Sequence, residues 1–194
     1  AYRVRANVTN KADPDVAGIV SGVNASKGVL FHGPTILCGY VNGSYVALET
    51  KTIKNVHWVM KTGASGTIVD SDAIMPYAHQ NGQVGSFVIM AVEKYAGPMG
   101  DGKIIVTGEN PYGGYQPMYT PSYYGYPLEG SKLVMNAVDW GVKVESLTDL
   151  LNAALATQSA QITTLTTQIG TLTTQLSTLQ TQITNLNTQI GSLQ

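Results

Sequence analysis

The stretch ITTLTTQIGTLTTQLSTLQTQITNLNTQIGSLQ, residues 162–194, decides how this chain is built. Its apolar residues recur at alternating steps of three and four, which is the seven-residue (heptad) repeat of a coiled coil. Ile or Leu fills each a position and Leu each d position, a combination that favours a parallel two-stranded coil over a trimer or tetramer. The predicted oligomerisation seam consists of Leu155, Ile162, Leu165, Ile169, Leu172, Leu176, Leu179, Ile183, Leu186, Ile190 and Leu193.

The residues beside this seam are polar but uncharged. Every g position from Gln161 to Gln189 is Gln, and the e positions are Thr, Gln or Asn, so no salt bridge can select a partner. Thr is a poor helix former, and Gly170 and Gly191 weaken the helix further, so pairing must hold it together. The alternative, a single helix folded back on the rest of the chain, fits less well, because so narrow a stripe suits another helix.

The composition changes near residue 145. All 11 basic and 12 acidic residues lie between Arg3 and Asp149, and none follows. We therefore predict a globular α/β (or α+β) domain over 1–144 and a parallel coiled-coil stalk over 145–194. A net charge of −1 excludes the electrostatic signature of nucleic-acid binding. One cysteine excludes an intrachain disulfide framework, and no apolar run approaches the length of a membrane span.

The first 144 residues show strand patterns separated by turns. Asn42-Gly43-Ser44 is a hairpin signal, and the two strongest runs, 85–95 and 102–109, predict buried central strands. A Tyr- and Pro-rich loop occupies 110–127, and 128–143 has a helical apolar face made of Leu133, Val134, Ala137, Val138 and Trp140. The remaining predicted strands are 28–31, 34–40, 44–49, 55–60 and 66–70.

The order of these elements is similar to that of a known family. GSFVIMAVEKYAGPMGDGKIIVTGEN (85–110), followed by LVMNAVDWGV (133–142), resembles the C-terminal half of class I glutamine-amidotransferase-like domains. The resemblance covers about 28–143 and implies a flavodoxin-like α/β sandwich. Its N-terminal half either lies upstream of residue 1 in a longer protein or is missing from a reduced domain. It implies fold and not activity, because the family's Cys nucleophile motif is missing around Cys38.

No catalytic, cofactor or metal site is predicted. Cys38 lies in a strand-like run and is expected to be a buried apolar residue. His32, His57 and His79 share no spacing typical of metal ligands or of a catalytic base. Asp-Ser-Asp at 70–72 is expected to be a plain turn rather than a cation site.

Two surface features are worth following. Three weak N-glycosylation signals begin at Asn7, Asn24 and Asn42. The tyrosine loop (110–127) is expected to contact protein, its own rings or a neighbouring subunit, rather than sugar. Its tyrosines are Tyr112, Tyr115, Tyr119, Tyr123, Tyr124 and Tyr126.

Uncharged coiled coils of this composition resemble the stalks of archaeal surface-layer and membrane-anchored surface proteins. We therefore expect a non-enzymatic, extracellular structural protein without cofactors. It would form homo-oligomers through the stalk, contact other envelope proteins, and meet a membrane only through a segment absent from this chain. The alternatives are a membrane-tethered module binding sugar or peptide for transport, and a subunit of an extracellular filament.

Overall fold

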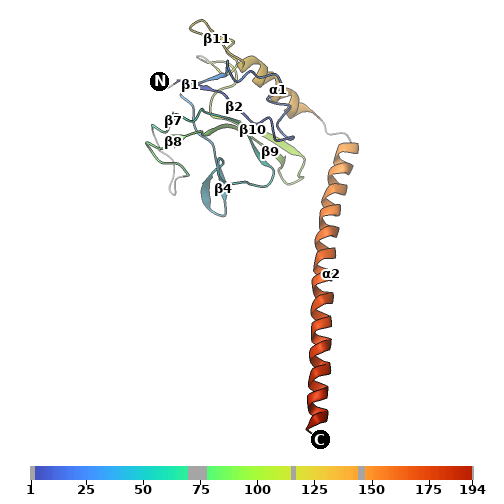
Figure 1. Cartoon of the computed structure of the whole chain (residues 1–194). Coiled ribbons are helices and arrows are strands. Elements are labelled where there is room, and N and C mark those ends of the chain that lie inside the picture. The colour runs from blue at the N-terminus through green and yellow to red at the C-terminus, as the bar shows by residue number, and fades with distance from the viewer. Residues whose placement is uncertain (1–2, 70–77, 115–116, 144–146, 194) are drawn as a thin grey trace. The chain divides into compact units, whose positions relative to one another are not determined.

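The computed structural model describes residues 3–69, 78–114, 117–143 and 147–193. The chain divides into two compact units, Ala1–Lys143 and Val144–Gln194. The first unit carries all of the strands and one helix, and the second is one long helix (Figure 1). The predicted mixed α/β class with a long C-terminal helix is confirmed at this level.

A four-stranded sheet with the order β10-β9-β6-β2 forms the centre of the first unit. Its three strand pairs are all antiparallel. Antiparallel neighbours on both sides of β9 differ from the parallel βαβ units that a flavodoxin-like sandwich requires, so the structure does not support that finer prediction. The strands are β2 (Val8–Thr9), β6 (Val56–Lys61), β9 (Val88–Ala96) and β10 (Gly102–Thr107).

Small antiparallel hairpins and ribbons surround this sheet. The predicted turn after Val41 is confirmed: Asn42 and Gly43 both have positive φ, 50° and 82°, as a two-residue hairpin turn needs. Most of the predicted strand at 34–40 is irregular, because regular pairing begins only at Cys38. The pairs are β1 (Arg3–Ala6) with β3 (Val29–His32), β4 (Cys38–Val41) with β5 (Ser44–Ala47), β7 (Gly66–Thr67) with β8 (Val84–Gly85), and β11 (Ser122–Tyr123) with β12 (Tyr126–Pro127).

Helix α1 (Gly130–Val142) contributes one wall of the core. Leu133, Val134 and Ala137 are buried, as their helical spacing predicts. Val138 is 43% exposed, which makes its assignment to the core face wrong, because it lies one position past the buried stripe. The indole of Trp140 packs at the core's edge.

The turn-rich segment between β2 and β3 contributes a part of the core that the sequence analysis did not predict. Val16, Ile19, Val20 and Val23 are fully or almost fully buried, at the spacing of a helix face. The backbone forms consecutive turns here, with the N–H of Ala17 and of Val20 each bonding a carbonyl four residues back. This segment, 13–24, packs with the sheet and α1 in one hydrophobic cluster.

The two strongest strand signals differ in their burial. In β9 the first five residues, from Val88 to Val92, are all buried, so this strand is central as predicted. The prediction of a buried central strand at 102–109 is wrong, because β10 is the edge of its sheet. Its residues alternate between faces, which leaves Ile104 and Val106 each 45% exposed.

Helix α2 runs without a break from Leu147 to Ser192 (orange to red in Figure 1). Its 46 residues extend about 70 Å at 1.5 Å per residue. Gly170 and Gly191 lie inside it, so neither glycine ends the helix. In the described part of the chain, no helix combines the length and the apolar character that crossing a bilayer requires.

Candidate functional site

The predicted seam lies along α2 except for Leu193, which directly follows the helix, and every member of the seam is exposed in the single chain. Exposure of these side chains ranges from 53% for Leu155 to 87% for Leu193. Leu151, four residues before Leu155, has the same character at 58%. A row of large apolar side chains exposed over a whole helix is the mark of an unfilled interface.

The threonines of α2 satisfy their hydroxyls within the helix. Twelve of them donate to the carbonyl oxygen four residues back, at 2.8–3.1 Å. A hydroxyl that already has an acceptor inside its own helix does not need one on a partner. Of these threonines, Thr166 and Thr173 flank the seam at e positions. The other flanking residues from Gln161 onward are uncharged amides, so the apolar stripe is the part of the helix surface most suited to association.

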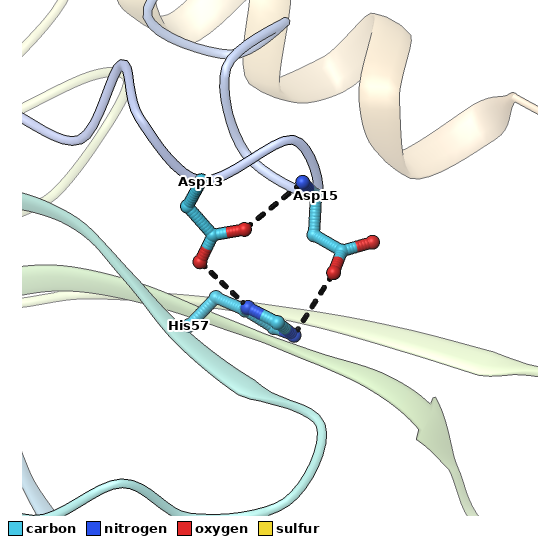
Figure 2. A group of neighbouring side chains, drawn as sticks. All are labelled: Asp13, Asp15 and His57. Atoms are coloured by element: carbon cyan, nitrogen blue, oxygen red, sulfur yellow. Dashed lines mark hydrogen bonds and ion pairs between the residues drawn. The ribbon is translucent and has the colours of Figure 1, made fainter. Parts of the chain in front are cut away.

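A second candidate site joins Asp13 and Asp15 to His57 of β6 (Figure 2). His57 Nδ1 lies 2.8 Å from Asp13 Oδ2, and His57 Nε2 lies 3.6 Å from Asp15 Oδ2. Asp13 Oδ1 accepts a hydrogen bond of 3.0 Å from the backbone N–H of Asp15, which closes the short turn carrying both acids. We call Asp13, Asp15, His57 and Lys94 the charge cluster.

The rest of the charge cluster decides its chemistry. Lys94 of β9 donates to Asp15 Oδ1 at 2.7 Å, and this ammonium would repel a cation placed between the carboxylates. The indole N–H of Trp140 donates to the backbone carbonyl of Asp15 at 2.9 Å. Each carboxylate oxygen thus already has a donor or an ion-pair partner. The three side chains are spaced as metal ligands could be. Their contacts nevertheless indicate a structural role, in which the charge cluster connects segment 13–24 to β6, β9 and α1.

The sequence analysis missed this cluster because its members are 44 and 79 residues apart. The only local feature is the pair of acidic residues Asp13 and Asp15 on either side of Pro14, and this pattern is typical of a turn. The absence of a shared histidine spacing was therefore a correct observation. It could not show that His57 meets carboxylates from a distant segment.

Cys38 was predicted to be buried, and that is wrong: its side chain is exposed at the start of β4. Although the residue is exposed as a whole, neighbouring groups still cover part of the thiol, and this partial burial together with the negative charge of Glu49 raises its pKa. Glu49 Oε2 lies 2.9 Å from His79 Nε2, and its Oε1 accepts from the backbone N–H of Val88. The neighbouring histidine is thus paired with the carboxylate rather than with the thiol in the interactions seen.

Burial works against a charge on Glu49, whose side chain is 13% exposed. The hydrogen bonds from His79 and from the Val88 backbone nevertheless outweigh burial and lower the pKa of Glu49. The ring of His79 meets Phe87 edge-on at 5.4 Å between centroids. This half-buried pair holds the segment after β5 against β9, and it offers no activated nucleophile.

The tyrosine loop packs largely on itself. Tyr112 lies 5.6 Å from Tyr119 and Tyr123 lies 4.5 Å from Tyr124, between ring centroids. Buried Met118 anchors the loop in the core, and Tyr124 is 81% exposed. Tyr115 lies outside the described residues, as does the Asp-Ser-Asp turn at 70–72.

Tyr123 and Tyr126 also border a shallow apolar depression that Arg5, Leu30 and Leu128 complete. Its volume of about 140 Å³ is well below the 300–1,000 Å³ of ordinary ligand pockets. The depression gives little support to a sugar or peptide site.

The three N-glycosylation signals lie on the surface. Asn7, Asn24 and Asn42 are all exposed, and Asn42 is at the tip of the β4–β5 hairpin. Asn24 Oδ1 accepts hydrogen bonds from the backbone N–H and the hydroxyl of Ser26.

Comparisons of the chain with protein-family models, with curated proteins and with solved structures find no match in any of the three.

Proposed function

We propose that this chain is a non-enzymatic structural protein of the cell surface, in which α2 forms a parallel coiled coil with other copies and holds the β-rich domain away from the membrane. One observation carries the proposal: a heptad seam, unbroken from Ile162 to Leu193, whose apolar side chains are all more than half exposed in the single chain. A second copy of the chain is the occupant that fits this seam, because the stripe is narrow and repeats at the coiled-coil period.

The lack of charge in α2 supports a partner of the same kind. Identical helices that meet in parallel bring identical flanks together, which would cause repulsion if those flanks carried one sign of charge. The described part of α2 after Asp149 has no charged residue, so copies can align without that cost. A dimer follows from Ile at a with Leu at d, and a trimer or tetramer is the next choice.

The state of the thiol and histidines supports a non-enzymatic role. The only thiol, Cys38, is held protonated beside a carboxylate, which is the opposite of an activated nucleophile. His57 and His79 are each committed to carboxylates that bind elements together. The exposed asparagines of the three glycosylation signals fit a surface location.

The finer fold proposal is that residues 28–143 correspond to the C-terminal half of an amidotransferase-like domain. Its support is the chain order of β9, β10, a long loop and α1. The antiparallel pairing of β9 with both neighbours stands against it. An experimental structure with a parallel sheet in this region would favour the relationship.

Sedimentation equilibrium of the full chain tests the proposed function. We expect a mass that is a whole multiple of 20.6 kDa at micromolar concentration, and labelling of the β-rich domain by a membrane-impermeant reagent on intact cells. A monomer at all accessible concentrations would overturn the oligomeric stalk. Protection of the domain on intact cells, with labelling only after lysis, would overturn the surface location.

A further inference from the structure

The heptad phase of α2 also extends from Ile162 toward the N-terminus of the helix. Leu155 and Leu151 take the preceding a and d positions, and both are more than half exposed. The d position between Leu155 and Ile162 is Gln158, seven residues before Leu165. One polar residue, on α2 and exposed in the single chain, therefore interrupts a seam that is apolar on both sides of it.

The remaining seam contains little information about alignment. From Ile162 onward the a and d positions repeat Ile and Leu, with Leu176 as the one exception. The neutral e and g residues cannot mark the register by charge. A partner displaced by one heptad would meet nearly the same surface, shifted by about 10 Å along the axis, and an antiparallel partner would meet a similar one.

We propose that Gln158 sets the register and the parallel orientation of the coiled coil, by forming one self-complementary hydrogen-bonded layer between copies; this rests on the proposed function of α2. A carboxamide both donates and accepts, so each Gln158 satisfies the same residue of another copy when the chains are aligned. In a chain displaced by one heptad, Gln158 faces Leu151 or Leu165, and its buried amide loses its partners.

The residues around Gln158 suit such a layer. Ser159 occupies the adjacent e position, where the later heptads from Ile162 onward have Thr, Gln or Asn. Ala154 occupies the preceding g position, where every later heptad has Gln. Small side chains at these two places leave room for paired carboxamides, and the Ser159 hydroxyl is one more hydrogen-bonding group at the rim.

The test uses the full chain with Cys38→Ser, which removes the native thiol, and with Thr188→Cys, which carries the spin label. Position 188 is an outward f position near the end of α2. Double electron–electron resonance should show one short, narrow interchain distance in the chain that keeps Gln158. Gln158→Leu should raise the thermal midpoint of the coil, since a buried polar layer costs stability. It should also broaden the distances, adding copies displaced by about 10 Å or antiparallel copies with far longer separations.

Two variants control this experiment. Gln158→Asn keeps a carboxamide in the seam and should keep the single narrow distance. Thr167→Leu adds the same Leu side chain on the outward f face and should leave the distance unchanged. If Gln158→Leu forms oligomers with the same single distance as its parent, the register role is wrong while the coiled coil stands. If the parent chain is monomeric, the proposed function fails as well.

Discussion

Leu172→Ala offers the most direct measure of what the seam contributes. Burying a Leu side chain completely is worth about 1.5–3 kcal/mol. Leu172 is 63% exposed in the single chain, so association can gain about three fifths of this, roughly 1–2 kcal/mol per chain. Two chains lose that gain together in a dimer, about 2–4 kcal/mol, and the dissociation constant should rise about 30- to 700-fold.

Sedimentation velocity over a concentration series measures this change directly. Thr174→Ala is the matched control, because it truncates an outward residue two positions away and removes only a bond to the Gly170 carbonyl. Its dissociation constant should stay close to that of the parent chain. If Leu172→Ala and Thr174→Ala dissociate at the same concentration, the exposed seam is not the interface, and the reasoning from heptad to oligomer is refuted.

Three further predictions concern the β-rich domain, whose two tryptophans report its unfolding. The carboxylate of Glu129 lies 3.1 Å from Lys27 Nζ and 3.4 Å from Lys132 Nζ, and these partners lower its pKa, as His79 and the Val88 backbone lower that of Glu49. The stabilisation from both carboxylates is therefore present above the ordinary pKa of 4.5 and is lost as pH falls through the lower folded values. The fluorescence midpoint should drop in acid while the helical circular dichroism of the uncharged coil holds, and parallel loss of both would contradict this. Cys38 should react with a thiol reagent more slowly at pH 8 than an unfolded control, and Glu49→Gln should speed it; an unchanged rate would exclude the carboxylate as a cause. His57→Gln should lower the free energy of unfolding in urea by about 1–3 kcal/mol without altering sedimentation. An unshifted urea midpoint would show that the charge cluster does not stabilise the domain.

The features predicted most accurately from the sequence were local in origin. Alternating steps of three and four placed the seam on α2, and Asn42-Gly43 marked a hairpin because only residues tolerant of positive φ fit that turn. β9 was recognisable because a strand buried on both faces is continuously apolar. Each of these signals lies within a few residues, so no knowledge of the fold was needed.

The errors came from places where distant segments decide the outcome. Nothing in Lys103–Thr107 says that it lies at a sheet edge, since that depends on which strands pair. Cys38 looked apolar in its run, but its face of a two-stranded ribbon is open. The charge cluster brings Asp13 to His57 across the fold, and the buried run Val16–Val23 was obscured by Gly18 and Gly22, although its helical spacing was present.

Because α2 has no charges beside its seam, the register and orientation of the coiled coil must be specified by the seam itself. In most coiled coils the charged e and g residues select partner and orientation, and a polar residue in the seam can specify the register. Here those positions are neutral amides and hydroxyls, and the hydroxyls of Thr166 and Thr173 are already bonded within their own helix. What remains is the seam, and the seam repeats itself. A polar residue at d distinguishes one alignment from the next far more strongly than Leu176 does, because Leu176 replaces one apolar side chain by another. The stability of an uncharged coiled coil should thus depend little on salt and acid. Its copies can still align in one register, provided that Gln158 of one copy faces Gln158 of the next.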